Sequence, residues 1–221
     1  MSGVPASLDL RGDPDADLAR VIRHLQADGL VAYPTETVYG VGGRTTRAAV
    51  ERLRRLKARE TEKPFILLVE SPQAVEGLRW TPAARDLAEV FWPGSLTLVL
   101  EDPLDIFPGW LRDPGRRAVG VRVSPHAVVA RLLKALGGPL TSTSLNAPGE
   151  PPAMSGAEAV EVLRRLGAGD VLVLDAGTLP HSGPSTIVDC TGDEPRVLRE
   201  GSVPLSRLRC AIPRIHGNEP T

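Results

Sequence analysis

The 221-residue sequence predicts an α/β fold with a mixed sheet. Short aliphatic runs, such as the one at residues 66–69, alternate with segments in which apolar residues recur at helical spacing. Late in the chain several apolar runs follow one another with no helical segment between them, which favours a mixed sheet over a purely parallel one. Four segments also share one helix-start signal, a capping residue followed by a first-turn proline: Asp13-Pro14, Ser71-Pro72, Thr81-Pro82 and Ser124-Pro125.

The elements follow from these signals in chain order. The first helix begins at Asp13-Pro14, places Leu18 and Leu25 on one face and ends at Gly29. Further helices are predicted near residues 46–57, 72–78, 82–91, 125–136 and 156–166. Strands are predicted at residues 30–33, 65–69, 96–100, 118–123, 139–143, 171–174, 186–190 and 196–199.

The domain organisation predicted is one main domain over residues 13–205, with an N-terminal arm at 1–12 and a short C-terminal tail at 206–221. The aliphatic runs are far shorter than the roughly 18 residues typical of a membrane span. The N-terminal residues lack the basic and apolar regions of a signal peptide, so a cytoplasmic location without a membrane is expected.

Composition limits the classes of function. A net charge of −1 and only eight aromatic residues argue against a protein that holds nucleic acid by bulk electrostatics. These numbers do not exclude a local basic cleft. The basic residues include only three lysines, Lys57, Lys63 and Lys134. Neither the cysteines nor the histidines show metal-ligand spacing, so no protein metal site is expected.

The stretch YPTETVYGVGG, residues 33–43, is rich in hydroxyl groups and glycine. If it is extended, Tyr33, Thr35, Thr37 and Tyr39 share one face. The glycines would allow a ligand to approach the backbone closely, yet the stretch matches neither a P-loop nor the GxGxxG fingerprint. A ligand pocket and an ordinary strand with a turn both remain open.

Basic residues gather at the end of the second predicted helix, in LKARETEKP. Lys57, Arg59 and Lys63 would form a cationic rim suited to polyphosphate. The alternative is a set of charges that complement the helix dipole and face solvent.

Polar side chains also follow several predicted strands. Arg122 alternates with small residues in RAVGVRV, which leaves room for a carboxylate or phosphate, or for a buried ion pair with a protein carboxylate. Ser142, Ser144 and Asn146 share one face of TSTSLN, at a strand end where α/β sheets bind ligands, although serine and asparagine also form turns. GPSTIVDC adds Ser185, and VLREG adds Arg199.

Together these motifs resemble the YrdC/TsaC family of L-threonylcarbamoyladenylate synthases. The matching pieces span residues 30–201 and also include WPGSLTLVL. The resemblance implies a short, single-domain type with a twisted open sheet around a basic concave cleft. It also implies a nucleotidyltransferase for tRNA N6-threonylcarbamoyladenosine synthesis. The chain departs from the family's usual STSAN-Ser-Gly at Leu145 and Ala147.

The resemblance also implies residue roles. Lys57 and Arg59 would be catalytic and bind ATP phosphates, with Lys63, Ser144, Asn146 and Arg199 completing the ATP site. Thr35, Thr37, Tyr39, Arg122, Ser142 and Ser185 would line the threonine and carbamate side. ATP would bring Mg²⁺ with it.

The implied partners are L-threonine, bicarbonate and ATP, and the enzymes that transfer the threonylcarbamoyl group to tRNA; direct contact with RNA stays open. The alternative functions are an RNA-binding module and a carbamoyl-adenylate-forming domain, since hydrogenase-maturation carbamoyltransferases contain a similar domain.

Overall fold

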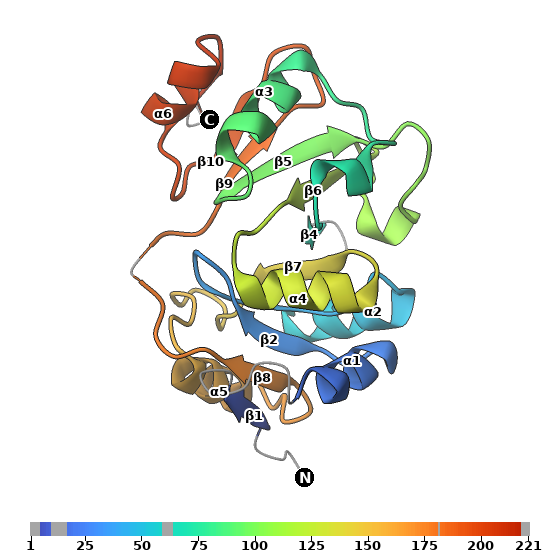
Figure 1. Cartoon of the computed structure of the whole chain (residues 1–221), viewed down its shortest axis with the longest axis vertical. Helices are drawn as coiled ribbons and strands as arrows, with labels where there is room; N and C mark the ends of the chain where they lie inside the picture. Colours follow the sequence, from blue (N-terminus) through green and yellow to red (C-terminus); the bar gives the residue numbers. More distant parts are fainter. Residues whose placement is uncertain (1–4, 10–16, 59–63, 181, 218–221) are drawn as a thin grey trace.

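The computed structural model describes residues 5–9, 17–58, 64–180 and 182–217. Within these residues the strands form one ten-stranded open sheet in the order β1-β8-β2-β3-β7-β4-β6-β5-β9-β10 (Figure 1). The sheet mixes parallel pairs, such as β4 with β6, and antiparallel pairs, such as β3 with β7, which confirms the predicted fold class. The strands are β1 (Ser7–Asp9), β2 (Val31–Pro34), β3 (Tyr39–Gly42), β4 (Ile66–Leu68), β5 (Leu96–Glu101), β6 (Ala118–Arg122), β7 (Leu140–Ser144), β8 (Leu172–Asp175), β9 (Thr186–Asp189) and β10 (Arg196–Arg199).

Three of the described helices begin with a hydroxyl side-chain cap, of which Thr81 was predicted from its capping signal. Thr46, Thr81 and Ser155 are the N-caps of α2, α3 and α5, and each side-chain oxygen accepts a hydrogen bond from a backbone N–H group three residues later. The helices are α1 (Leu18–Gln26), α2 (Arg47–Leu56), α3 (Pro82–Phe91), α4 (Ala127–Leu136), α5 (Gly156–Arg165) and α6 (Leu205–Ala211), with short 3-10 helices η1 (Pro72–Val75) and η2 (Gly109–Leu111). No helix in the described ranges is both long and apolar enough to cross a membrane.

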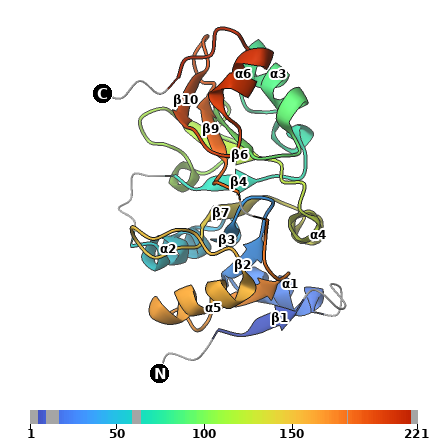
Figure 2. The same ribbon diagram turned by 90° about the vertical axis from the view of Figure 1, so that its left-hand side faces the viewer.

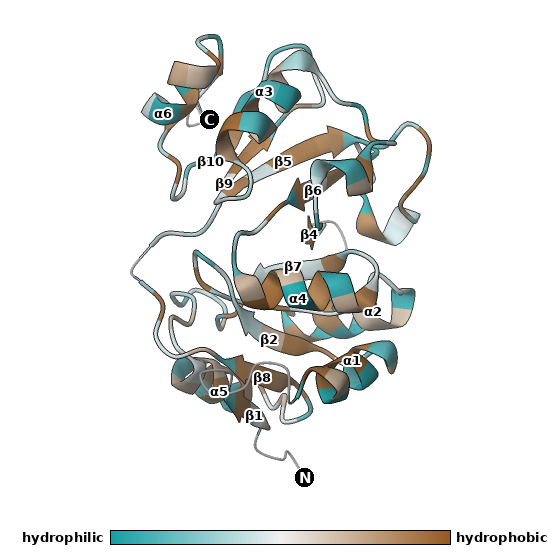
Figure 3. Cartoon of the chain, in the orientation of Figure 1, coloured by the Kyte–Doolittle hydropathy of each residue, from teal (hydrophilic) through white to brown (hydrophobic). Residues whose placement is uncertain are grey.

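Around β2 and β3, helices cover both faces of the sheet, and β2 is buried on both sides. Figure 2 shows α1 and α4 on one side of β2 and β3, with α2 and α5 on the other. Along β2, Val31 and Tyr33 join the apolar cluster beneath α1 and α4, whereas Ala32 joins the cluster beneath α2 and α5. This burial on two faces explains why strands such as β4 and β8 read as continuous apolar runs (Figure 3).

Two helix predictions differ from the structure, and the start of a third is not tested. The Asp13-Pro14 start lies outside the described residues, and α1 is described from Leu18. The start of α4 is not Ser124-Pro125, because His126 is the N-cap and its ring accepts a hydrogen bond from the N–H group of Val128. The predicted helix at 72–78 is only the 3-10 helix η1.

The two ends of the described chain are attached to the domain. Within the expected N-terminal arm, Ser7–Asp9 form β1 and pair in parallel with β8, and the Leu8 side chain is buried. In the expected C-terminal tail, α6 buries Leu208 in the main apolar cluster. Both segments are therefore packed against the domain.

Candidate active site

The turn between β2 and β3, residues 35–38, is held by the hydroxyl group of Thr35. Its Oγ1 accepts hydrogen bonds from the N–H groups of Thr37 and Val38, each at 3.2 Å, and donates to the Val38 carbonyl oxygen at 2.7 Å. Bonds of this kind are typical of threonine in a turn. The chain reverses direction here, since β2 and β3 pair in antiparallel fashion. An extended segment with four hydroxyl groups on one face is therefore wrong.

The two tyrosine hydroxyl groups of this stretch bond to other parts of the protein. Tyr33 is fully buried and donates to the carbonyl oxygen of Thr141, and burial raises the pKa of its hydroxyl group. Tyr39 donates to the carbonyl oxygen of Gly177 at 2.8 Å and accepts from the N–H group of Ala176. The structure thus directs the Tyr39 hydroxyl towards the segment after β8.

A cavity of about 130 Å³ brings most of the predicted site residues together. Its walls come from the β2–β3 turn and from the ends of β6, β7, β9 and β10, which lie far apart in sequence. Seven of the predicted residues line it, namely Thr35, Thr37, Arg122, Ser142, Ser144, Ser185 and Arg199. Tyr39, Lys57 and Asn146 are not among its lining residues, and Arg59 and Lys63 lie outside the described residues.

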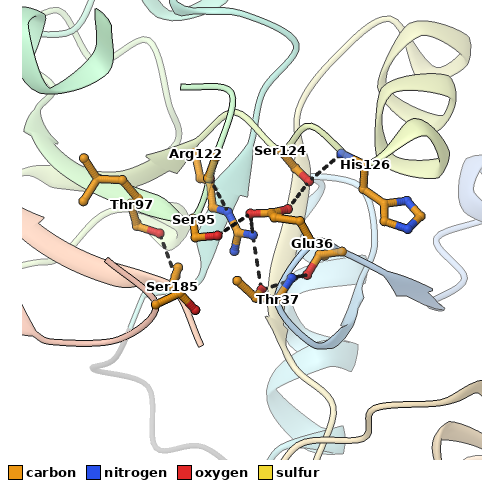
Figure 4. A network of polar contacts seen from close by, with 12 residues as sticks. Glu36, Thr37, Ser95, Thr97, Arg122, Ser124, His126 and Ser185 are labelled. Carbon is orange, nitrogen blue, oxygen red and sulfur yellow. Dashed lines mark hydrogen bonds and ion pairs between the residues drawn. The ribbon is translucent and has the colours of Figure 1, made fainter. Parts of the chain in front are cut away.

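Arg122, the last residue of β6, is fixed by an ion pair with Glu36 (Figure 4). Its Nε donates to the carbonyl oxygen of Gly94 at 3.1 Å, and an Nη donates to Thr37 Oγ1 at 3.2 Å. Sequence reasoning left two accounts of Arg122 open, and the structure confirms the ion pair with a protein carboxylate. Arg122 also lines the cavity, whereas Glu36 is not among the lining residues and holds Arg122 from outside the cavity.

Glu36 connects three segments at this wall, and sequence reasoning missed it. Its carboxylate accepts hydrogen bonds from Ser124 Oγ at 2.6 Å and from Ser95 Oγ at 3.3 Å, in addition to the Arg122 pair. The available signal was that Glu36 is the only carboxylate in the hydroxyl-rich stretch. Nearby, burial lowers the pKa of His126, and the negative charge of Glu36 partly opposes that shift.

Another part of the cavity wall is built around Ser185. Its Oγ is 3.0 Å from the hydroxyl oxygen of buried Thr97, and its carbonyl oxygen accepts from an Nη of Arg199 at 2.7 Å. Ser182 Oγ donates to the carbonyl oxygen of Thr37 at 2.8 Å, which ties this wall to the β2–β3 turn. Thr97 and Ser182 are further residues that the sequence did not identify.

Lys57 joins the end of α2 to the end of β7. Its Nζ donates to the carbonyl oxygens of Ser144 and Asn146 at 3.1 and 2.8 Å, and to Asn146 Oδ1 at 2.9 Å. Ser144 Oγ donates to the same Oδ1 at 2.9 Å. Three predicted ATP-site residues therefore form one network beside the cavity. Leu145, the departure from the family motif, points the other way and is fully buried in the apolar core.

The glycines of the stretch serve different purposes. Gly40 lines the cavity, and a Cβ there would lie 3.3 Å from Ser142 Oγ. A Cβ at Gly42 would overlap the carbonyl oxygen of Thr141 in β7, and one at Gly43 would press on Leu30. At Gly42 and Gly43 the close approach is thus between protein segments and does not involve a ligand.

Two further features bear on the chemistry of the site. Within the described ranges, no group of three or more histidine, cysteine, aspartate or glutamate residues is placed to hold a metal ion. Two arginines, Arg122 and Arg199, line the cavity, but the charge of Arg122 is balanced by Glu36. The net positive charge expected of a basic concave cleft therefore stays a prediction.

The chain is similar to proteins of one family. Residues 23–201 match the family model Sua5_yciO_yrdC, described as "Telomere recombination". A curated relative from Nitrosococcus oceani, named threonylcarbamoyl-AMP synthase, is 40% identical over 177 residues, which cover 77% of this chain and 90% of the relative.

Several solved structures share the fold. The crystal structure of P. abyssi Sua5 complexed with L-threonine has a TM-score of 0.86 and 28% identity, and it covers 97% of this chain. This chain spans 62% of that protein. The structure of E. coli YciO has a TM-score of 0.80 and 26% identity, and the match covers 93% of this chain and 99% of YciO.

Proposed function

Because the chain belongs to the Sua5/YciO/YrdC family, we propose that it is an L-threonylcarbamoyladenylate synthase. It would act as a nucleotidyltransferase that converts L-threonine, bicarbonate and ATP into L-threonylcarbamoyl-AMP and pyrophosphate. The N. oceani relative carries the name of this activity, and the P. abyssi relative was solved with L-threonine.

The observation that carries the proposal is the convergence of hydroxyl and guanidinium groups in one small cavity. Its volume of about 130 Å³ is below the roughly 300–1,000 Å³ of sites for drug-sized ligands, so it suits a small polar amino acid rather than a whole nucleotide. Five of its lining residues, Thr35, Thr37, Arg122, Ser142 and Ser185, are among those that the family resemblance implies for threonine and carbamate.

On the threonine side, we assign the polar contacts to Arg122, Ser142 and Ser185. The Glu36 pair orients the Arg122 guanidinium, and the remaining N–H donors would face the substrate carboxylate. Thr35 and Thr37 shape the turn that forms the adjacent wall. Tyr39 would support the site from behind through its bonds to Ala176 and Gly177.

On the nucleotide side, Lys57, Ser144 and Asn146 form a polar network next to the cavity. Arg199 lines the cavity and donates to the carbonyl oxygen of Ser185. In the proposed reaction the threonine amine and bicarbonate form a carbamate and release water. A carbamate oxygen then attacks the α-phosphorus of ATP, and the bond to pyrophosphate breaks. Lys57, with Arg59, would stabilise the charge that develops on the phosphates, and Lys63 would add a further cation.

Mg²⁺ would enter with ATP, coordinated mainly by phosphate oxygens and water. The mixed anhydride would pass to the enzymes that transfer the threonylcarbamoyl group to tRNA, so we place the protein in the cytoplasm.

The test is pyrophosphate release from ATP and Mg²⁺ with bicarbonate plus L-threonine, with carbamoyl phosphate, or with neither. The proposal predicts release only when L-threonine and bicarbonate are both present, with an acid-labile threonylcarbamoyl-AMP found by mass spectrometry. Release with carbamoyl phosphate alone would indicate carbamoyl adenylation instead. Salt-dependent RNA binding without turnover would indicate an RNA-binding module.

A further inference from the structure

A second and larger cavity, of about 380 Å³, lies on the other side of the β6 end from the candidate active site. Arg122 lines the active-site cavity, and the next residue, Val123, lines this one. Such alternation is expected because successive side chains of an extended segment point in opposite directions. The two cavities are therefore separate sites that share a stretch of backbone.

The position of this cavity is one where α/β proteins bind ligands. β4 and β6 are parallel neighbours, so their carboxyl ends meet at one edge of the sheet. Glu70 and Val123, just beyond those ends, both line the cavity. Crevices outside the carboxyl ends of strands are the usual ligand sites of open α/β sheets.

Two indole rings form the apolar part of the wall. Trp80 and Trp92 meet edge to face, with ring centroids 6.0 Å apart. Both indole N–H groups point into the protein, to the carbonyl oxygens of Val75 and Leu96 respectively. The rings are thus held in place and offer carbon surface and π-electron density to the cavity.

The charged groups around the cavity are mainly acidic. Glu70, Glu76 and Glu89 line it against one cation, Arg85. Among the described residues, none of the three carboxylates forms an ion pair within 4 Å. The Arg85 guanidinium lies 5.8 Å from the Trp80 ring centroid, so a guanidinium cation of the protein itself already lies over one of the indole rings.

From this combination we propose that the cavity is a binding site for an organic cation, a guanidinium or alkylammonium group on an aliphatic stem. The stem would lie against the indole rings, and the cationic head would meet the carboxylates of Glu76 and Glu89. Such a group occurs on a free small molecule or on an arginine side chain of another protein. The chemistry is the same in both cases.

The test compares n-butylguanidinium with n-butylurea, which has nearly the same shape and no charge, in an NMR titration of the ¹⁵N-labelled protein. The protein has three tryptophans, and Trp110 lies outside this cavity, with its indole N–H bonded to Thr45. Trp110→Phe identifies the reference signal. Saturable shifts of the other two indole signals with n-butylguanidinium, and not with n-butylurea, are expected.

Substitutions of the carboxylates and of Arg85 should change the binding affinity in opposite directions. Glu76→Gln and Glu89→Gln should each weaken binding roughly two- to fivefold, in the range of exposed ion pairs. Arg85→Gln should tighten binding because it removes the competing cation. Glu51→Gln, an exposed carboxylate on α2 outside the cavity, is the matched control and should leave binding unchanged.

The source of the cation is decided by a second titration, with acetyl-Gly-Arg-Gly-amide. Tighter binding of the peptide than of n-butylguanidinium would support an arginine side chain of a partner protein, and weaker binding would support a free cation. Equal shifts with n-butylurea, or unchanged affinity in both glutamate variants, would overturn the proposal. None of these readouts depends on synthase activity.

Discussion

At the scale of single residues, the candidate site depends on side chains that connect separate segments. Glu36 binds partners from β6 and from the segments that follow α3 and β6, and Lys57 ties α2 to the end of β7. Each therefore combines a proposed effect on the substrate with an effect on the shape of the site. Measurements at these residues need variants that separate the two effects.

Replacing Lys57 with alanine should reduce the rate of pyrophosphate release by a factor on the order of 10² to 10³, because one positioned charge would be lost from the transition state. Steady-state assays with L-threonine, bicarbonate and ATP measure this loss. Lys134→Ala, which removes the other lysine in the described residues from the exposed side of α4, is the control. Equal turnover in the Lys57 variant and the wild type would show that this assignment is wrong.

Glu36→Gln should lower the free energy of unfolding by about 2 kcal/mol, since it leaves Arg122 mostly buried without its counter-charge. Urea unfolding followed by circular dichroism gives the value. The control is Glu51→Gln, which breaks the exposed pair with Arg47 and should change stability by no more than about 0.5 kcal/mol. A loss of the same size in both variants would mean that the Glu36 pair has no special structural role.

At the scale of elements, the strand pairs and helix caps determine how closely segments can pack. β3 lies so close to β7 that only glycine fits at position 42. α4 begins with a histidine cap that is half-buried beside the Glu36 network. Both features produce measurable effects on stability.

Gly42→Ala should lower the free energy of unfolding by about 3 kcal/mol, because the added methyl group would overlap the backbone of β7. The effect is measured by thermal unfolding of Gly42→Ala. The control variant is Gly138→Ala, because a Cβ at Gly138 meets nothing within 4 Å. If the two variants unfold at the same temperature, the close contact between β3 and β7 does not exist in solution.

Stability should fall as the pH falls below about 6.5, in part because of His126. Its pKa is lowered in the folded protein from 6.5, mainly by burial, so the unfolded chain binds a proton more readily. This contribution is fully present above the unfolded pKa and is lost as the pH falls through it towards the folded value. His126→Asn keeps a capping side chain that does not titrate.

The measurement is the difference in unfolding free energy between wild type and His126→Asn, followed from pH 8 to pH 5. The wild type should lose stability more steeply below pH 6.5. A pH-independent difference would show that His126 titrates with the same pKa in both states.

At the scale of the whole molecule, the chain brings its N-terminal segment to the sheet edge furthest in strand order from β9 and β10. β1 pairs only with β8 among the described strands, while the active-site cavity is lined by residues from the β2–β3 turn onwards. Removal of residues 1–16 should therefore lower stability by about 2 kcal/mol through exposure of the site that buries Leu8. The KM values for L-threonine and ATP should not change, and a rise in either would connect β1 to the site.

The sequence predicted most strands and helices because their apolar periodicity and caps are local signals. β1 was missed because three residues at a sheet edge carry too little pattern, and β3 because its glycines conceal a strand. The turn at residues 35–38 was left as one of two alternatives, because alternating hydroxyl and other residues also fit an extended strand. The Glu36–Arg122 pair joins residues 86 positions apart, and a local sequence pattern cannot predict a contact between residues so far apart in the chain.

The active-site cavity takes its walls from Thr35 near the start of the chain and from Arg199 near its end. During synthesis, a nascent chain that stops before β9 has a β2–β3 turn but neither Ser185 nor Arg199 to face it. The substrate therefore has no complete site to bind until almost the whole protein has left the ribosome. A ligand stabilises only the state that binds it. If threonine binds in this cavity as proposed, it therefore cannot assist early folding intermediates and protects only the finished protein.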